Sequence, residues 1–288
     1  MDRKIMVTTD STADLTPELV EKYGLYVFPL GIEMDGKTYR DGIDVVPDDL
    51  YDYYRRTGKI AHSSAYSVGD YHEKFAALVA EGYDVVHVGL ADYLSCTLQN
   101  AQIAAEDFDN VYVINSKRLS TGIGQLAIAA AEMVAEGHGP KEIYDVLSER
   151  AYCLDVSFVL DTLEYMHAGG RCSGVAKLGA NLLKIKPQIV VYDDVMDSGK
   201  KYRGKINACR LQYIEEQLHD VDDICLDRIF MTHSGMSQED IDLVVAKIKS
   251  IADFKEVLVT RAGCVISCHC GPGTCGVLFF RKHRVFSN

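Results

Sequence analysis

DVVHVGL at residues 84–90 is a short and nearly continuous apolar run. Such a run is typical of a strand in a parallel sheet that is covered on both faces. The residues that follow, 94–108, have the pattern of a helix starting near Ser95, and NVYVINS at 110–116 predicts the next strand. Strand, helix and strand in this order indicate a βαβ unit, so the sequence predicts an α/β protein with a parallel sheet.

The same alternation fills the rest of the first half. Asp35-Gly36 is a strong signal for a hairpin turn, and HSSAYSVGD at 62–70 predicts a polar loop. Prolines and glycines mark where the helices start and stop. Further strands are predicted at 4–8 and 25–30, and helices at 16–24, 48–58, 70–82, 126–137 and 140–152.

The second half has a different pattern, in which the strands look mixed or antiparallel. VSFVLDTL at 156–163 predicts a strand that leads into the glycine-containing HAGGRCSG at 167–174, and a helix is expected to reach about Leu183. Further strands are predicted at 186–204 (two, joined by a turn), 224–232 and 256–261, with helices at 205–219 and 237–252. We therefore predict a second, α+β domain that begins near residue 153.

The composition is that of an ordinary globular protein, with 288 residues of which 48% are hydrophobic and 25% charged. The formal net charge of −12 argues against a nucleic-acid partner and against peripheral binding to anionic membranes. Without an apolar run of about 18 residues, no transmembrane helix and no stable membrane insertion are expected. Nine cysteines, an odd number, follow an N-terminus that enters a strand directly, so we expect reduced thiols and a cytoplasmic location.

Hydroxyl side chains gather after the predicted parallel strands, where open α/β sheets bind ligands. Ser95 follows the strand at 84–90 at a predicted helix N-terminus, which favours an anion. Ser63 and Ser64 lie in the loop before the helix that leads to this strand. Serine is also a good helix cap, so a purely capping role for Ser63 and Ser95 stays open.

GCVISCHCGPGTCG at 263–276 contains one histidine and four of the nine cysteines. Its Gly-Pro-Gly at 271–273 predicts a tight, exposed turn beside His269. We interpret the stretch as a loop that closes over a small-molecule site whose other wall lies far earlier in the chain. A structural zinc site is the alternative, because thiolate and imidazole are the usual zinc ligands. However, the stretch has no CxxC pair, and the adjacent Cys268 and His269 point in different directions on an extended chain.

The common local signatures of enzymes are absent from the sequence, including GxxxxGK[ST], GxSxG and HExxH. Gly122, Gly124 and Ala127 spell GxGxxA, but the preceding strand ends near Ile114, too far away for the tight turn of a dinucleotide site. Neutral hydroxyls and one histidine around a cleft suit the holding of a carboxylate more than chemistry.

Nine segments, in order over nearly the whole chain, resemble the motifs of the DegV family, the bacterial fatty-acid-binding proteins that serve a fatty acid kinase. Several of these motifs are weak individually, but together they are specific. They are TTDSTADLTPEL at 8–19, YRDGIDV at 39–45, HSSAYSVGDY at 62–71, LSCTLQNAQ at 94–102, INSKRLSTGIGQLA at 114–127, DTLEYMHAGGRCSG at 161–174, LLKIKPQIV at 182–190, YRGK at 202–205 and CHCGPGTCGV at 268–277.

The resemblance implies a two-domain fold, in which a parallel α/β/α domain, residues 1–152, joins a smaller two-layer α/β domain with a mixed sheet, residues 153–288. It also implies a long-chain fatty acid buried between helices and sheet, with its carboxylate held at the domain junction. A separate kinase would then make the acyl-phosphate for lipid metabolism. The protein itself would be a carrier without catalytic activity, and it would need no cofactor.

Matched residue by residue, the resemblance also implies roles for individual side chains. Two arginines, Arg171 and Arg203, match family positions that we associate with docking of the kinase. The residues implied to contact the fatty acid are Ser63, Ser64, Ser95 and His269.

The chain departs from the family pattern around the mouth of this site. Ala91-Asp92-Tyr93 replaces Ser-Ser-Gly, Cys96 replaces glycine, and Ala65 and Tyr66 replace Gln and Pro. We expect the bulkier side chains to change the preference for chain length or head group, and Asp92 would repel a carboxylate unless it points away. A phosphotransferase-like enzyme is an alternative function, because the first domain of the family resembles that of dihydroxyacetone kinases. A zinc-binding structural protein is a third.

Overall fold

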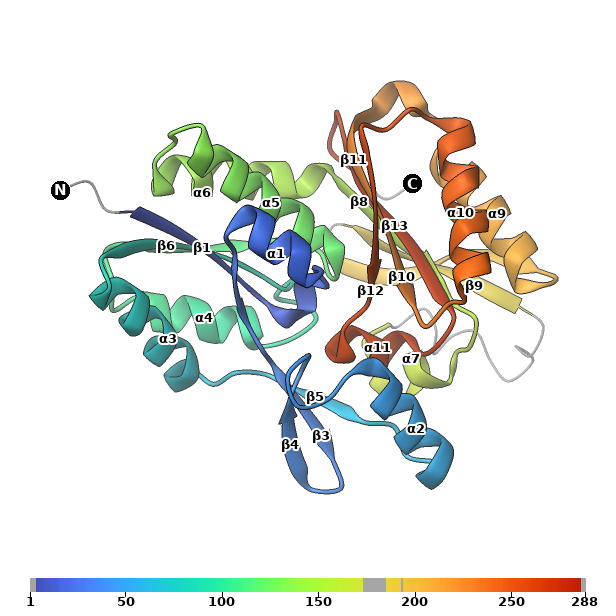
Figure 1. The fold of residues 1–288 in the computed structure, drawn as a ribbon, viewed down its shortest axis with the longest axis horizontal. Helices are drawn as coiled ribbons and strands as arrows, with labels where there is room; N and C mark the ends of the chain where they lie inside the picture. The colour runs from blue at the N-terminus through green and yellow to red at the C-terminus, as the bar shows by residue number, and fades with distance from the viewer. Residues whose placement is uncertain (1–3, 173–184, 193, 286–288) are drawn as a thin grey trace.

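The computed structural model describes residues 4–172, 185–192 and 194–285, and the N-terminal half is built on a four-stranded parallel sheet (Figure 1). The strands lie in the order β2-β1-β6-β7, and all neighbouring pairs are parallel. Their bounds are β1 (Lys4–Asp10), β2 (Tyr26–Phe28), β6 (Tyr83–Gly89) and β7 (Val111–Asn115). The βαβ unit predicted around residues 84–116 is thus confirmed.

Helices cover both faces of this sheet, which explains why β6 is apolar on both sides. Val85 packs towards α3 and α4, whereas Val86 and Val88 pack towards α5 and α6. Alternate side chains of a strand point to opposite faces, so both faces must be apolar. The helices are α1 (Pro17–Tyr23), α3 (Val68–Ala80), α4 (Thr97–Ala105), α5 (Thr121–Ala135) and α6 (Pro140–Arg150), with 3-10 turns η1 (Ser11–Ala13) and η2 (Ala151–Cys153).

The C-terminal half contains a six-stranded mixed sheet in the order β10-β9-β8-β13-β11-β12. Only β11 and β12 pair in parallel, and the other neighbours are antiparallel. The mixed sheet expected from the sequence is confirmed. The strands are β8 (Leu154–Val159), β9 (Ile185–Tyr192), β10 (Val195–Arg203), β11 (Ile224–Ser234), β12 (Glu256–Arg261) and β13 (Thr274–Arg281).

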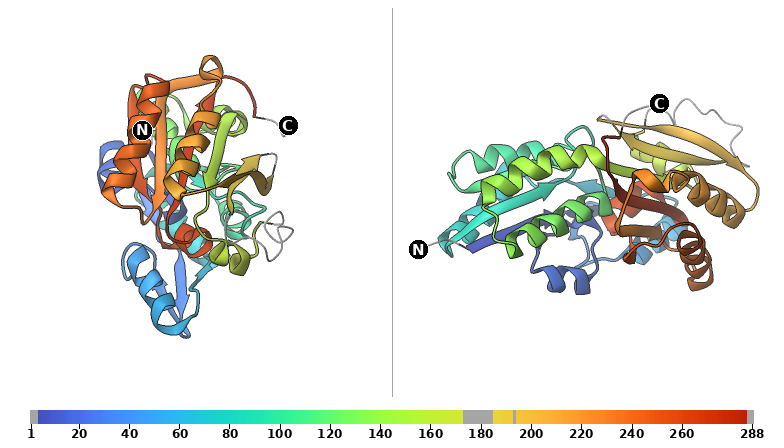
Figure 2. Two further views of the ribbon diagram at one scale, coloured as in Figure 1. Left: turned by 90° about the vertical axis from the view of Figure 1, so that its right-hand side faces the viewer. Right: turned by 90° about the horizontal axis from the view of Figure 1, so that it is seen from above.

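One face of the mixed sheet packs on its own helices and the other packs on the N-terminal half. α9 (Ile206–Gln217) and α10 (Gln238–Ile251) cover the first face, and η3 (Val221–Asp223) precedes β11. On the second face, Phe158 and Leu278 join the same apolar cluster as Ile123 and Leu126 of α5. This helix therefore lies between the two sheets, and Figure 2 shows the two halves side by side. The boundary predicted between residues 152 and 153 falls in η2 and stays a prediction.

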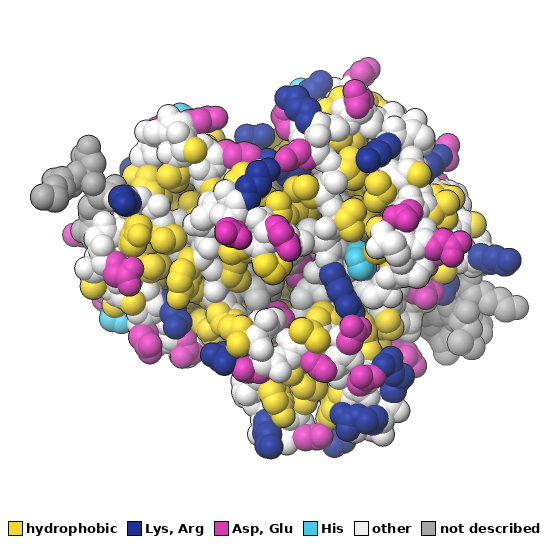
Figure 3. All heavy atoms as spheres, viewed as in Figure 1, with side chains coloured by type: hydrophobic (Ala, Val, Ile, Leu, Met, Phe, Trp, Pro, Cys, Tyr) yellow, Lys and Arg dark blue, Asp and Glu magenta, His cyan; other side chains and the backbone are white. Residues whose placement is uncertain are grey.

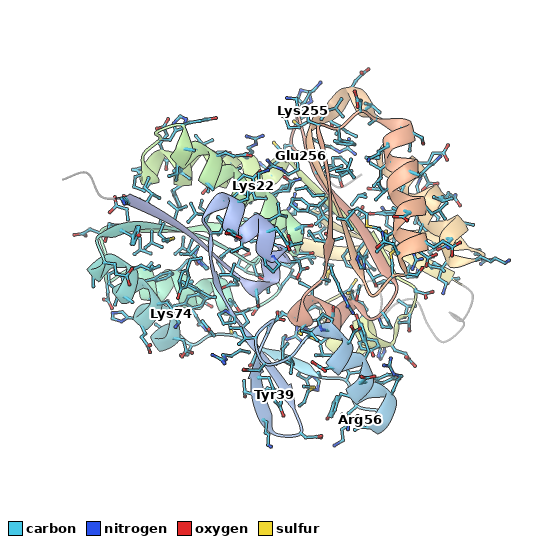
Figure 4. All side chains as sticks on the ribbon, in the orientation of Figure 1. Lys22, Tyr39, Arg56, Lys74, Lys255 and Glu256 are labelled. Atoms are coloured by element: carbon cyan, nitrogen blue, oxygen red, sulfur yellow. The ribbon has the colours of Figure 1, made fainter. Side chains whose placement is uncertain are left out.

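Polar contacts also join the halves across this seam. Thr121 Oγ1 lies 2.6 Å from Thr232 Oγ1, and Gln125 Nε2 donates to the carbonyl oxygen of Leu278 at 3.2 Å. At the surface, Lys22 of α1 forms an ion pair of 3.1 Å with Glu256 of β12 (Figure 4).

A small antiparallel sheet, in the order β4-β3-β5, projects from the N-terminal half together with α2 (Figure 1, bottom). The predicted Asp35-Gly36 turn joins β3 to β4, and both of its residues have positive φ, 49° and 76°. The elements are β3 (Gly31–Met34), β4 (Lys37–Arg40), β5 (His62–Ser64) and α2 (Pro47–Thr57).

The structure corrects several sequence-based expectations. The polar loop expected at 62–70 contains β5, because its backbone pairs with β3. The loop expected at 263–276 begins with a helix, α11 (Cys264–Cys270), and continues into β13, which the sequence did not predict. α7 (Glu164–Gly169) was not predicted either, and the helix expected to reach Leu183 lies outside the described residues.

Candidate ligand-binding site

A cavity of about 320 Å³ lies where the two halves meet, and both halves line it. The N-terminal half contributes β5, the loop between β6 and α4, and Leu119. The C-terminal half contributes α7, α11, and the side chains of Phe158 and Met196 from the mixed sheet. Both halves of the molecule are therefore needed to form the cavity.

Four of the lining residues are those that the sequence singled out for ligand binding, namely Ser63, Ser64, Ser95 and His269. Ser63 Oγ and His269 Nε2 are 3.0 Å apart, although 206 positions separate the two residues in the chain. Ser95 Oγ lies 2.7 Å from Thr97 Oγ1 and accepts a hydrogen bond from the Thr97 N–H at 3.2 Å. Thr97 also lines the cavity and is the first residue of α4. The sequence placed its hydroxyl beside that of Ser95 after the strand at 84–90, but the family motifs did not include it among the residues implied to contact the fatty acid.

The sequence predicted that His269 lies beside an exposed turn. It lies instead in the last turn of α11, where it is half-buried. Burial, together with the positive charge of Arg171, lowers the pKa of His269 to about 4. At neutral pH its imidazole is therefore uncharged, with one nitrogen as donor and the other as acceptor. A ligand at this position meets neutral hydrogen-bonding groups, with Arg171 as the cation in the cavity lining.

Arg171 and Arg203, expected to serve the same partner, lie in different places. Arg171 lines the cavity, and its Nη1 donates to the carbonyl oxygen of Gly169 at 2.6 Å. Arg203 is exposed at the end of β10, an edge strand, and does not line the cavity. A partner role for both residues stays a prediction, but Arg171 is placed to affect the ligand as well.

The rest of the cavity wall is apolar. Sequence reasoning did not identify this wall, because its residues come from seven separate segments without a shared periodicity. The apolar wall comprises Leu30, Leu90, Leu94, Leu119, Phe158, Met166, Met196, Val265 and Ile266. A further apolar hollow of about 40 Å³ shares Leu119, Phe158, Ile266 and Cys270 with it.

Two other hollows have volumes of about 460 and 450 Å³, but paired charges line them. In the first, Arg228 contacts both Glu132 and Glu256. In the second, Arg210 Nη1 lies 3.1 Å from Asp240 Oδ2. An apolar ligand would remove these charges from water without replacing the interaction, which is costly. The smaller cavity is therefore the better candidate for a binding site.

Most of the residues that depart from the family pattern lie outside the lining of this cavity, and their effect on ligand preference stays a prediction. Asp92 is exposed, lies 4.0 Å from Lys117 Nζ, and is absent from the cavity lining. Tyr66 and Tyr93 do not line it either, since Tyr66 packs against Tyr71 and Tyr93 against the core. Of these residues, Cys96 and Ala65 reach the cavity.

The cysteines of the C-terminal stretch are buried thiols. Burial raises the pKa of Cys268, Cys270 and Cys275 to about 12, which disfavours the thiolate that zinc requires. In the described part of the chain, no group of three or more His, Cys, Asp or Glu side chains is placed to hold a metal ion. These observations do not favour the zinc alternative.

Acidic and basic side chains are mixed over the face shown in Figure 3, without a continuous basic stripe on that face. Nucleic-acid binding through phosphate contacts needs such a stripe. Within the described ranges, every helix is too short or too polar to cross a membrane.

The fold and the cavity together define a class, the two-sheet α/β proteins that enclose a largely apolar cavity between a parallel and a mixed sheet. Comparison with known families is consistent with this class and narrows it. The family model of DegV, described as an uncharacterised protein family, matches residues 4–282. The chain therefore belongs to the DegV family, as the sequence motifs indicated.

Individual relatives and solved structures match this chain over nearly its whole length. A DegV domain-containing protein of Caldanaerobacter subterraneus is 30% identical over 281 residues, covering 97% of this chain and 99% of the relative. The structure of a Thermus thermophilus DegV family protein, named for its fatty acid binding, has a TM-score of 0.89 and 26% identity, covering 96% of this chain and 99% of that one. A stearic acid-binding protein of Eubacterium ventriosum has a TM-score of 0.84 and 25% identity, covering 96% and 98%.

Proposed function

We propose that this protein binds a long-chain fatty acid in the cavity between its halves, with the carboxylate near Ser63, Ser95 and His269. The observation that carries the proposal is one cavity that combines neutral hydrogen-bonding side chains with an apolar wall. A fatty acid has the same two parts. The solved relatives that are named for fatty acid or stearic acid binding support this assignment.

The two parts of the cavity have different energetic roles. Burial of about fifteen methylene groups, at about 0.8 kcal/mol each, gives a gross free energy on the order of 12 kcal/mol. The cost of association and of ordering the chain removes a large share of this. The acyl tail therefore supplies most of the affinity, whereas the hydroxyl and imidazole groups orient the carboxylate.

Extraction of the ligand tests the proposal directly. Protein made in a bacterial host is expected to carry one acyl chain of about 14–18 carbons, identified by mass spectrometry. After delipidation, the free acid should bind again, and its methyl ester should bind more weakly because it lacks the anionic head group. If no acyl chain is extracted and the delipidated protein binds none, the proposal is wrong.

Replacement of Gly169 by alanine should weaken binding of the acid about tenfold, the loss expected for one hydrogen bond. Gly169 ends α7 directly against the imidazole of His269, and a Cβ there would overlap Nδ1. The substitution should displace the imidazole from its present position beside Ser63. Titration of the delipidated variant with a fatty acid measures the effect.

Gly170→Ala is the matched control for this substitution. Gly170 has a φ of 64°, and a Cβ added to it would meet no atom within 4 Å. Alanine there costs about 1 kcal/mol of backbone strain but leaves the imidazole in place. Lower stability with unchanged affinity is the expected result. Equal loss of affinity in both variants would show that the contact between Gly169 and His269 is not responsible.

We also propose that the protein has no catalytic activity and presents the carboxylate to a separate fatty acid kinase. Ser63 and His269 resemble a nucleophile and its base, but the described residues place no hydrogen-bond partner on His269 Nδ1. Such a pair lacks the orienting group of a catalytic triad. Incubation with ATP, Mg²⁺ and a fatty acid should therefore give no acyl-phosphate. Formation of acyl-phosphate by the protein alone would favour the phosphotransferase alternative.

The nine free thiols agree with a cytoplasmic location, which we propose as well.

Arg203→Glu should leave the affinity for fatty acid unchanged while reducing use of the bound acid by the kinase. The reason is that Arg203 lies on an exposed edge strand, away from the cavity. Arg171→Glu is the comparison, because it places a negative charge in the cavity lining and should weaken both steps. Kinase assays with each variant, alongside direct titration, separate the two roles. Normal kinase use of the Arg203 variant would contradict its assignment.

A further inference from the structure

The first turn of α11 is capped by the carboxyl groups of two residues from the other half of the molecule. The Gly263 N–H donates to Asp14 Oδ1 at 2.8 Å and the Cys264 N–H to Asp41 Oδ1 at 2.8 Å. The Val265 N–H donates to Asp41 Oδ2 at 3.3 Å. The N–H groups of a first helical turn have no partner within the helix, so these three bonds satisfy most of them.

The helix has no cap of its own. Its N-cap residue is Gly263, which has no side chain to accept a hydrogen bond. A Cβ at this position would come within 3.2 Å of Asp14 Oδ1 and of Asp41 Oδ2, so glycine also leaves room for both carboxylates. The capping groups follow η1 and β4, more than 220 positions earlier in the chain.

Both carboxyl groups are nearly inaccessible, with 5% exposure for Asp14 and 4% for Asp41. In the described ranges neither forms an ion pair with Lys or Arg, and Asp14 instead accepts a hydrogen bond of 2.5 Å from the Ser120 hydroxyl. A buried carboxyl group is costly unless it is hydrogen-bonded. Here the N–H groups of α11 provide hydrogen bonds to both carboxyl groups, which ties these groups and the helix to one position.

The other end of the same helix carries His269. α11 has only seven residues, so its two ends are about 10 Å apart and move as one body. At this end His269 Nε2 meets Ser63 Oγ, which again belongs to the N-terminal half. The imidazole therefore stands where the capped first turn places it.

We propose that Asp14 and Asp41 are positioning residues of the ligand site: by capping α11 from the N-terminal half, they set the place of His269 at its other end. This inference rests on the proposed function, because a role in ligand binding requires that the protein binds a fatty acid. The position of the His269 imidazole can nevertheless be measured without a ligand.

Three variants test the role of the caps. Asp41→Ala removes the acceptors of the Cys264 and Val265 N–H groups and should weaken fatty acid binding about tenfold or more. Asp41→Asn keeps one acceptor oxygen and should retain part of the affinity. Ser237→Ala is the matched control, because it removes the cap of a different helix, α10, where Ser237 Oγ accepts from the Asp240 N–H at 3.2 Å. It should leave the affinity unchanged.

The ¹⁵N NMR signals of the His269 imidazole, recorded on delipidated protein, report its hydrogen bond with Ser63. They should shift in Asp41→Ala and stay in place in Ser237→Ala. A folded Asp41→Ala variant with unchanged imidazole signals and unchanged affinity overturns the proposal. If Asp41→Ala does not fold, Asp41→Asn decides, since it places an NH₂ donor where one of the two acceptor oxygens faces the Cys264 or Val265 N–H, and the signals should still shift. If wild-type protein binds no fatty acid, the proposed function fails, whereas the imidazole signals still test the positioning.

Discussion

Replacing Ser95 by alanine is expected to weaken fatty acid binding about tenfold to a hundredfold without unfolding the protein, because a hydrogen bond to a charged group contributes about 1.5–3 kcal/mol. In the structure the Ser95 hydroxyl is 2.7 Å from the Thr97 hydroxyl. If Thr97 donates in this pair, the Ser95 hydrogen is free to donate to a carboxylate. Titration calorimetry on delipidated protein measures the loss.

Ser63→Ala should have an effect of similar size, since this hydroxyl also holds His269. The double variant should lose less than the sum of the two single losses, because both hydroxyls act on one anion. Ser250→Ala, on the exposed side of α10, is the control and should bind normally. A double variant with wild-type affinity would show that the carboxylate lies elsewhere.

The free energy of unfolding should pass through a maximum near pH 6.5 and then fall by about 1 kcal/mol on going to pH 8. Burial raises the pKa of Asp10 to about 7 and that of Asp14 to about 8. Above pH 6.5 the folded protein therefore keeps protons that the unfolded chain has released, so stability falls as the pH rises. Below pH 6.5 the free energy of unfolding instead falls as the pH falls, because of His87, His233 and His269. Their pKa values are lowered to about 3–4, so the unfolded chain binds more protons there.

Asp10→Asn and Asp14→Asn together should abolish the fall between pH 6.5 and 8. Asparagine keeps an acceptor for the Tyr71 hydroxyl, which donates to Asp10 Oδ1 at 2.7 Å, and for the Gly263 N–H at Asp14. Asp44→Asn is the control, since Asp44 is exposed and its pKa is lowered to about 2 by Arg40. It should leave the slope unchanged. Urea denaturation at several pH values gives the measurement, and a slope that persists in the double variant would contradict the assignment.

Sequence patterns predicted the fold wherever the deciding interactions are local. The apolar run at 84–90 and the strand after it predicted the parallel sheet, and Asp35-Gly36 predicted the hairpin, because strand burial and turn conformation depend on neighbouring residues. β5 and β13 were not predicted from the sequence, because their strand partners lie elsewhere in the chain. α11 was not predicted for a similar reason, since its cap comes from Asp14 and Asp41 rather than from Gly263.

The site was predictable only in part. Hydroxyls at the ends of parallel strands indicated Ser95 as a candidate without further information. Nothing in the periodicity of the chain joins Ser63 to His269, and only the family motifs suggested that they meet. The structure supplies the missing contact by bringing β5 and α11 together, at 3.0 Å between the two side chains. The apolar wall of the cavity could be identified only from the structure.

β13 lies in the interior of the mixed sheet, between β8 and β11, and is buried along nearly its whole length. On the ribosome, β8 to β12 are synthesised before it, so the nascent chain first exposes the unpaired edges of β8 and β11. Free strand edges are templates for aggregation. The mixed sheet therefore cannot be completed until residues 274–281 have been synthesised. A chain released before residue 274 should keep those edges unpaired and be a target for chaperones and proteases.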